Sequence, residues 1–322
     1  MGWMLLAVFS FVICLMPMTW LFAWKIGAVD VPKDWRRMHR KSIPRNGGLA
    51  IGLGFFLGCA LIGIDSPFWG YTVGLGAVIL GLGLIDDVNP LPARVKLLIQ
   101  MVCSLTVVGK GIGARGWEAF GAFFWILLLT NAHNFIDGLD GLFCGCAAME
   151  AFTVSLFFVG LGMPERAALS AALAVALLGF RVFNRHPAVI FAGDCGSGSV
   201  GFWLGVMSWD LFRLHGGVEI PMLPLLIFAY PLADLAAAVL RRILRGKSPF
   251  YADRGHLHHR ICDAGISSAQ CARILLTISF CFCALSLLIG VWSRYELASI
   301  ACLTTACLLM LMRHRIVRRN SF

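Results

Sequence analysis

Long apolar runs separated by short polar connections cover almost the whole chain. A helix needs about 20 mostly apolar residues to cross the hydrocarbon core of a bilayer. Runs of about this length recur, which predicts an all-α, polytopic membrane helical bundle. We expect about 11 transmembrane helices, near residues 3–24, 47–64, 68–85, 97–112, 117–132, 142–161, 165–183, 198–213, 219–240, 272–291 and 294–312.

Composition agrees with this pattern. Of the 322 residues, 59% are apolar and 14% are charged, and the mean hydropathy is +0.82. These values exclude an ordinary soluble domain. No repeat or low-complexity segment interrupts the runs, so we expect one integral membrane domain over 1–322.

The cysteines form no CxxC motif and lie mainly inside apolar runs, as small buried hydrophobic residues do.

Basic residues are distributed unevenly between the two sides of the predicted bundle. One side carries 22 of the 27 Lys and Arg residues and the other carries five. The positive-inside rule therefore places the N-terminus outside and the C-terminus in the cytoplasm. The net charge of +10 follows a membrane face instead of a compact soluble module, which argues against nucleic-acid binding.

Most polar chemistry falls in the predicted cytoplasmic connections, near 25–46, 86–96, 131–142, 184–198 and 241–271. We therefore expect these loops to form a catalytic face. The first contains "VDVPKDWRRMHRKSIPRNGG", a basic stretch followed by paired glycines. It either contacts anionic lipid or binds a ligand that carries phosphate.

The second connection begins with two adjacent carboxylates, Asp86 and Asp87, at the end of an apolar run. Carboxylates are expensive to hold at a lipid boundary and are ligands for divalent cations. Arg94 and Lys96 follow within ten residues and suit phosphate groups. An alternative is a helix cap followed by a turn at Pro90, although a cap needs only one aspartate.

The stretch "TNAHNFIDGLDGL" places Asn131, Asn134, Asp137 and Asp140 at intervals of three residues. If it is helical, these side chains share one face. No basic residue accompanies them, so a functional cluster here requires a cation, a donor or a protonated partner. A merely polar helix start is the alternative.

A Gly- and Ser-rich turn, "FAGDCGSGSVGF", leads directly into another apolar run. Free amide groups at such a helix start favour an anion, and Gly193 and Ser197 belong to this turn. Asp194 in the same turn could take a metal. Glycines in membrane helices also serve packing alone.

The last connection, "SPFYADRGHLHHRICDAG", holds His256, His258 and His259 beside Arg254. Three histidines suggest zinc, but the adjacent pair points to different sides of a helix or strand. Phosphate donors or a proton relay suit the basic surroundings better. We assign no role to the other histidines, at positions 39, 133, 186, 215 and 314.

Together the loops offer carboxylates, an anion-binding turn and cations at one face of a membrane bundle. Phosphoryl transfer with a divalent metal requires this combination, and the membrane setting implies that one reactant is a lipid. A secondary transporter is the rival class, but it predicts polar residues near the midplane and inverted halves. Here the carboxylates gather at the ends of predicted spans.

Four motifs, "GLIDDVN", "NAHNFIDGLDGL", "FAGDCGSGSVGF" and "SPFYADRGHLHHRICDAG", resemble in order and spacing those of the polyprenyl-phosphate N-acetylhexosamine-1-phosphate transferases. The resemblance covers residues from about 30 to 270. The histidine segment is most similar to the branch that uses undecaprenyl phosphate and UDP-N-acetylglucosamine, and differs from the muramoyl-pentapeptide branch.

This resemblance implies transfer of a sugar 1-phosphate from a UDP-sugar to undecaprenyl phosphate, with release of UMP. The implied cofactor is Mg²⁺ or Mn²⁺, and the implied product is a lipid-linked diphosphate sugar that starts a cell-surface glycan. The implied location is the bacterial inner membrane, with the site on the cytoplasmic face. Another UDP-N-acetylhexosamine as donor and a homodimer both stay open.

The resemblance also implies residue roles. Asp86 and Asp87 would serve the metal or deprotonate the lipid phosphate, and Asp194 would ligate the metal. Whether Asp87 acts as a base or as a covalent nucleophile stays open. The branch often has another aspartate where this chain has Pro90, so no role is transferred to that position.

The remaining motif residues would contact the substrates. Asn134, Asp137 and Asp140 would line the nucleotide and sugar pocket. The diphosphate or sugar would be held by His256, His258, His259 and Arg254, and further phosphate contacts would come from Arg94 and Lys96. Asp234, inside a predicted span, either supports such a residue or marks a helix break, or it makes a purely structural hydrogen bond.

Overall fold

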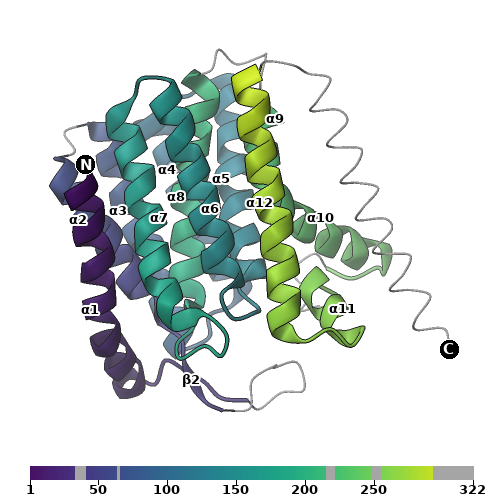
Figure 1. The fold of residues 1–322 in the computed structure, drawn as a ribbon. Coiled ribbons are helices and arrows are strands. Elements are labelled where there is room, and N and C mark those ends of the chain that lie inside the picture. The colour runs from purple at the N-terminus through teal and green to yellow at the C-terminus, as the bar shows by residue number, and fades with distance from the viewer. Residues whose placement is uncertain (33–40, 64–65, 215–221, 249–254, 293–322) are drawn as a thin grey trace.

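The computed structural model describes residues 1–32, 41–63, 66–214, 222–248 and 255–292. In this part of the chain, helices stand side by side in one bundle (Figure 1). Their bounds are α1 Gly2–Ile26, α2 Gly48–Ile62, α3 Pro67–Val88, α4 Ala93–Thr106, the π-helix η1 Val107–Ile112, α5 Gly116–Ile136, α6 Leu142–Gly160, α7 Pro164–Asn184, α8 Gly193–Leu214, α9 Met222–Ile227, α10 Ala229–Leu244, α11 Leu257–Asp263 and α12 Ser268–Trp292.

Seven stretches of helix in the described residues are long and apolar enough to cross a membrane. They are α1, α3, α4 continued by η1, α5, α6, α7 and α12. The prediction of a polytopic helical membrane protein is therefore confirmed. The last predicted span, 294–312, lies outside the described residues, so the count of 11 stays a prediction.

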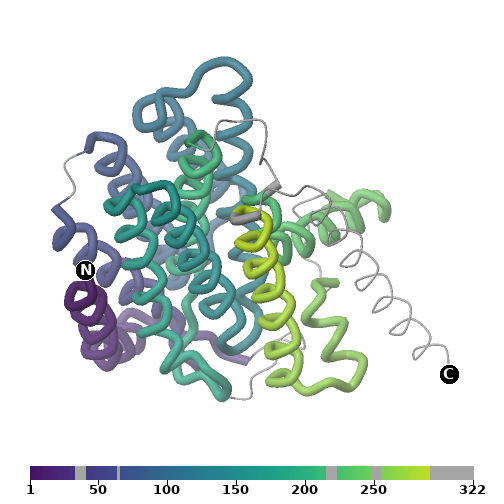
Figure 2. The backbone as a smooth tube through the Cα atoms, turned by 45° about the horizontal axis from the view of Figure 1, so that its top comes forward, coloured from purple at the N-terminus to yellow at the C-terminus, as the bar shows by residue number. Residues whose placement is uncertain are grey.

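The prediction of a single span over 219–240 is wrong. The chain forms the short helix α9, interrupts it at Phe228 and continues as α10. Pro231 contributes to the break, because proline has no amide hydrogen to bond the carbonyl of Ile227 four residues earlier. As a result α10 turns away from the bundle axis and projects at its side (Figures 1 and 2).

Two predicted loops contain regular structure. The connection near 25–46 holds a two-stranded antiparallel ladder of β1, Val29–Asp30, and β2, Ile43–Pro44, so the fold is not purely helical. The connection near 241–271 contains α11. These elements, together with the ends of α1, α3, α5 and α7, lie at one end of the bundle, at the bottom of Figure 1.

Helix α8 is buried along almost its whole length. Its first turn packs directly against backbone from two other helices. A Cβ atom at Gly48 of α2 would overlap the backbone of Gly196, and one at Gly83 of α3 would overlap that of Cys195. Small residues let membrane helices approach closely. This packing brings the start of α8 beside the acidic end of α3.

Candidate active site

Asp87 caps helix α8 from the neighbouring helix α3. Its Oδ1 accepts a hydrogen bond from the amide of Asp194 at 2.9 Å, and its Oδ2 accepts one from the amide of Cys195 at 3.2 Å. The first amides of a helix have no partner inside it, and a carboxylate satisfies them and suits the helix dipole. Asp87 therefore fixes the position of Asp194.

Asp86 stabilises the turn that follows α3. Its Oδ1 accepts a hydrogen bond from the amide of Leu91 at 2.7 Å. The helix ends at Val88, and Asn89 is extended because the proline at position 90 disfavours a helical conformation in the preceding residue. The turn interpretation is therefore confirmed, but both aspartates also pair with cations.

Three carboxylates and two cations form a continuous cluster. The guanidinium Nη2 of Arg45 lies 2.9 Å from Asp87 Oδ1 and 3.3 Å from Asp194 Oδ1. The Nζ of Lys96 lies 3.0 Å from Asp86 Oδ2 and 2.7 Å from Asp194 Oδ2. Asp86 and Asp194 also interact directly with each other. Negative charge exceeds positive charge here, which favours a further cation.

The four polar residues expected on one helical face are divided between helix and loop. Helix α5 ends at Ile136, so Asp137 and Asp140 lie beyond it and the expectation of one shared face is wrong. The flexible glycines of this motif explain the early end. Asn131 donates to Gln100 at 3.0 Å, whereas Asn134 donates to the Oγ of Ser197 at 3.1 Å.

Asp137 follows the last residue of α5 and is held among charges. Burial, and then the negative charge of Asp194, raise the pKa of Asp137 to about 7, while Arg45 and the amide of Gly193 oppose the shift. Burial lowers the pKa of Arg45, but Asp87 and Asp194 more than offset this effect and leave that pKa raised. Arg45 therefore stays charged, and Asp137 can change protonation near neutral pH.

Asp140 joins the loop after α5 to the loop after α7. Its Oδ2 lies 2.8 Å from Nδ1 of His186 and accepts a hydrogen bond from the amide of Ala188 at 3.1 Å. Asn184 strengthens this connection, because its Oδ1 accepts from the amide of Gly141 at 3.0 Å. The two loops therefore form one wall.

The histidine motif is organised by Asp234 of α10. One carboxylate oxygen lies 2.8 Å from His256 Nδ1, and the other accepts a hydrogen bond from the amide of Leu257 at 2.8 Å. Asp234 therefore orients His256 and caps α11 at the same time. The contact with His256 agrees with the first alternative, in which Asp234 supports a residue of the motif, while the role of His256 itself stays a prediction.

His258 and His259 point to different places. His258 packs against Gly138, where a Cβ atom would overlap its ring. Burial, and then the charge of His259, lower the pKa of His258 to about 3, so it is uncharged. His259 lines the main cleft described next. Among the described residues, no group of three or more His, Cys, Asp or Glu side chains is arranged to hold a metal.

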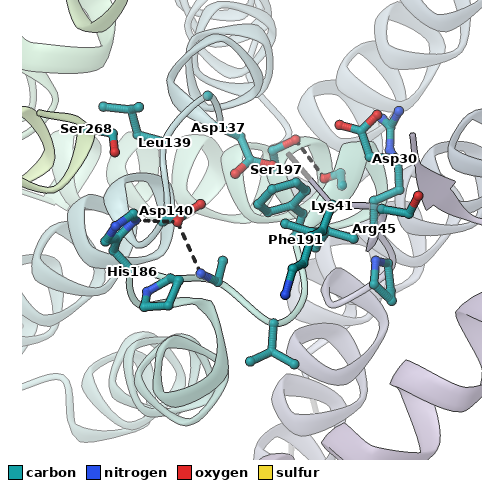
Figure 3. Close-up of a pocket in the computed structure, with 18 of the residues that line it drawn as sticks. Asp30, Lys41, Arg45, Asp137, Leu139, Asp140, His186, Phe191, Ser197 and Ser268 are labelled. Carbon is teal, nitrogen blue, oxygen red and sulfur yellow. Dashed lines mark hydrogen bonds and ion pairs between the residues drawn. The ribbon is translucent and has the colours of Figure 1, made fainter. Parts of the chain in front are cut away.

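Two cavities open at this end of the bundle. The main cleft has a volume of about 950 Å³ and is lined by residues from α1, β2 and the loops after α5 and α7. Figure 3 shows Asp140 and His186 on one side of it and Lys41 and Arg45 on the other.

The side cavity has a volume of about 200 Å³ and lies among α3, α4, α5 and α10. Lys96 and Arg242 line it together with apolar side chains. Asn134 and Asp194 line both cavities, so the two cavities meet at these residues.

The structure brings together most of the predicted site residues. Gly193, which has a left-handed φ of 74°, belongs to this group, as do Ser197 and Lys96. Arg94 is exposed and lines neither the main cleft nor the side cavity. Arg254 lies outside the described residues, so its role stays a prediction.

Sequence reasoning missed three residues that line the cavities: Arg45, His186 and Arg242. Arg45 belongs to the basic stretch before the second apolar run, and Arg242 lies at the start of the connection 241–271. The position of Arg45 shortly before two glycines was the available signal. His186 precedes a proline in the loop that carries Asp194, but nothing in its local sequence indicates its pairing with Asp140.

These features define a polytopic helical membrane protein with a charged, two-chambered site at one end of its bundle. Comparison with known proteins identifies the family. Residues 69–211 match the model of glycosyl transferase family 4. Together with the extended similarities described below, this match shows that the chain belongs to that family.

The chain is 35% identical over 289 residues to the probable undecaprenyl-phosphate N-acetylglucosaminyl 1-phosphate transferase of Bacillus subtilis, covering 84% of this chain and 80% of the relative. It is 32% identical over 295 residues to the undecaprenyl-phosphate alpha-N-acetylglucosaminyl 1-phosphate transferase of Escherichia coli, covering 84% and 78%. It is 33% identical over 303 residues to the decaprenyl-phosphate N-acetylglucosaminephosphotransferase of Mycobacterium tuberculosis, covering 79% and 74%.

Proposed function

We propose that the protein transfers N-acetylglucosamine 1-phosphate from UDP-N-acetylglucosamine to undecaprenyl phosphate and releases UMP. The names of the relatives support this reaction. The observation that carries the proposal is that a large cleft and a smaller cavity, each lined by both charged and apolar residues, share Asp194 and Asn134. A reaction between a nucleotide sugar and a lipid phosphate needs two chambers of this kind.

The main cleft suits the nucleotide sugar. Its volume of about 950 Å³ lies at the upper end of the range usual for small-molecule sites. Lys41, Arg45 and His259 line it and would face the diphosphate. Asp140 and Phe191, also on its wall, would contact the nucleoside or the sugar.

The side cavity suits the phosphate end of the lipid acceptor. Leu82, Leu97 and Phe135 form apolar parts of its wall. Lys96 and Arg242 supply two cations, and the guanidinium of Arg242 lies 5.3 Å from the centre of the Phe135 ring. An apolar wall with paired cations suits a phosphate attached to a prenyl chain.

Asp194 would place the two substrates relative to each other. One of its carboxylate oxygens pairs with Arg45, which lines the main cleft, and the other pairs with Lys96, which lines the side cavity. An oxygen of the lipid phosphate would attack the phosphorus that carries the sugar. The bond from that phosphorus to the departing UMP oxygen would break, and both cations would stabilise the charge that develops.

The acidic cluster fits a divalent cation, Mg²⁺ or Mn²⁺. Mg²⁺ usually binds one or two carboxylates and completes its shell with water and substrate phosphates. Asp86 and Asp194 interact directly and would hold the ion, with Asp87 adjacent. When bound, the ion would neutralise the diphosphate.

Asp87 is better suited to support this cluster than to attack the donor. Its side chain is fully buried, and both of its oxygens accept hydrogen bonds from the start of α8. A covalent nucleophile needs an oxygen that faces the donor phosphorus. The arrangement therefore favours direct displacement by the lipid phosphate.

We further propose that the protein lies in the bacterial inner membrane, with the N-terminus outside and the C-terminus and the site in the cytoplasm. The excess of 22 against five basic residues supports this orientation. The product, a lipid-linked diphosphate sugar, would then form on the cytoplasmic face and start a cell-surface glycan.

Transfer of labelled sugar phosphate from UDP-N-acetylglucosamine to undecaprenyl phosphate by the purified protein tests the proposal. We expect equal amounts of UMP and lipid-linked sugar, and loss of both in EDTA that Mg²⁺ restores. UDP-N-acetylgalactosamine and UDP-glucose serve as competing donors. Faster transfer from either would overturn the assigned sugar, and no transfer from any donor would overturn the reaction.

A further inference from the structure

A fully buried pair of ionisable side chains lies behind the proposed site. His133 of α5 and Glu150 of α6 are both 0% exposed, and His133 Nε2 lies 2.7 Å from Glu150 Oε2. The other ring nitrogen, Nδ1, lies 2.8 Å from the carbonyl oxygen of Leu129. Ionisable groups inside a membrane bundle are expensive to hold and usually serve a purpose.

Polar and aromatic contacts together hold the His133 ring in one orientation. The carbonyl of Leu129 only accepts, so Nδ1 carries a hydrogen, and a second proton is shared between Nε2 and Glu150. Phe143 and Phe228 contact the ring edge to face, with centroids 6.3 and 6.0 Å away. The ring is therefore held by two polar and two aromatic contacts.

Stability alone does not explain this pair. Replacing a buried ion pair by apolar residues of similar volume is often neutral or stabilising, because both charges lose hydration on burial. In addition, Glu150 Oε1 has no hydrogen-bond partner among the described residues. A pair that contributes so little to stability is better explained by the geometry that it imposes.

The His133–Glu150 pair lies close in the chain to two residues of the proposed site. His133 directly precedes Asn134, which donates to Ser197, and lies four residues before Asp137. Glu150 lies eight residues inside α6, roughly 12 Å from its start. The connection between the helices, 137–141, is held by the loop after α7 and by His258, whereas the His133–Glu150 contact joins α5 directly to α6.

We infer that His133 and Glu150 are positioning residues that fix the rotation of the last turn of α5, so that Asn134 faces both cavities and Asp137 faces the main cleft. This inference rests on the proposed function, because it concerns the rate of that reaction. Displacement of a substrate-contacting group by about 1 Å can reduce a rate by roughly 100-fold. A rotation of α5 would displace both residues together.

The test compares kcat, KM for UDP-N-acetylglucosamine and the thermal midpoint in four variants: Glu150→Gln, Glu150→Leu, His133→Leu and the double variant His133→Leu/Glu150→Leu. Each single leucine variant leaves one buried polar partner alone, so we expect kcat to fall at least about tenfold. Glu150→Gln should keep kcat within about threefold, because the glutamine amide can donate to Nε2 of a neutral His133.

The double variant shows whether the pair affects kcat through the position of α5 or through the stability of the protein. Removing both polar partners together should restore the thermal midpoint, yet kcat should stay at least about tenfold low because the contact with α6 that fixes the rotation of the last turn of α5 is lost. Ser155→Ala is the matched control: Ser155 of α6 donates to the carbonyl of Ala167 at 2.7 Å and joins α6 to α7 instead of α5. This control should lower the midpoint and leave kcat unchanged.

A double variant with native kcat would overturn the inference, as would a loss of kcat in Glu150→Gln equal to that in Glu150→Leu. Both results would leave the proposed function intact, because the native chain would still transfer the sugar phosphate. A native chain that transfers nothing would overturn the proposed function, and the inference with it.

Discussion

At the scale of single residues, Asp194 has the most connections in the site. It pairs with Arg45 and Lys96, interacts with Asp86 and receives its position from Asp87. Asp86 and Asp87 each serve two purposes, since their carboxylates accept hydrogen bonds from backbone amides and also pair with cations. This dual use explains why two adjacent carboxylates occur where a cap alone would need one.

Asp87→Asn and Asp194→Asn should each reduce UMP release at least about 100-fold, while protein levels in the membrane stay unchanged. At position 87 the new amide would oppose the backbone amides that it must cap, and at position 194 it would leave two cations without their shared anion. Release of UMP from the labelled donor measures the effect.

Asp210→Asn is the control for both substitutions. Asp210 is also buried and pairs with Arg166 at 2.6 Å, but it lies near the opposite end of α8. Its replacement should leave the rate within about threefold of native. Full turnover in Asp87→Asn or Asp194→Asn would remove that residue from the site.

Asp137 predicts a pH effect on stability. Its pKa of about 7 in the folded chain lies above its ordinary value of 3.8. The protonated carboxyl therefore contributes stability that is fully present below about pH 4 and is lost as the pH rises to about 7. An asparagine side chain does not titrate, so the variant Asp137→Asn keeps its stability above that range.

The measurement is the thermal midpoint of native and Asp137→Asn protein in detergent with EDTA. The advantage of the variant should grow from pH 5 to pH 7 and then stay constant to pH 9. An advantage that does not change with pH would contradict the raised pKa.

At the scale of helices, close packing around the start of α8 determines where the acidic residues meet. Gly48→Ala would place a Cβ atom against the backbone of Gly196, and α8 cannot move away from α2 without disturbing its cap from Asp87 of α3. We expect a loss of about 1–3 kcal/mol in stability and at least about tenfold in transfer rate.

Gly81→Ala in α3 is the matched control, because nothing lies within 4 Å of the added carbon. Unfolding in detergent and the transfer assay measure both variants. A Gly48→Ala protein as active and stable as Gly81→Ala would show that α2 and α8 tolerate a wider separation.

Much of the helical organisation was predictable, because apolar length alone determines where most spans begin and end. The break at Phe228 was not, since one proline within an apolar run does not show whether a helix bends or stops. The early end of α5 was missed for a related reason. Spacing by threes suggested a helix, but glycines and the pairing of Asp140 with His186 favoured a loop.

The sequence indicates which residues belong to the site, but it does not indicate how their side chains pair. Local sequence indicates that Asp87 and Asp194 are unusual, but not that one caps the helix of the other across 107 positions. Likewise, nothing near His133 in the sequence indicates its partner Glu150, which lies on the next helix. Such pairings depend on how helices pack, which the hydrophobic pattern does not determine.

At the scale of the whole molecule, the proposed orientation predicts which loops face the cell exterior. Arg185 lies exposed at the site end of α7, and Glu165 lies exposed at its other end. In intact cells, a membrane-impermeant maleimide should label Glu165→Cys and should label Arg185→Cys only after permeabilisation, relative to the native chain. The reverse pattern would place the site outside.

The wall shared by the main cleft and the side cavity has a consequence for inhibition. Asn134 and Asp194 border both cavities, so we expect one molecule with two joined halves to occupy both at once. A bisubstrate compound, with a uridine part joined to an alkyl phosphonate, should bind more tightly than its separate halves, since the second half would then bind intramolecularly. The linker length that gives the tightest binding would report the distance between the donor site and the acceptor site.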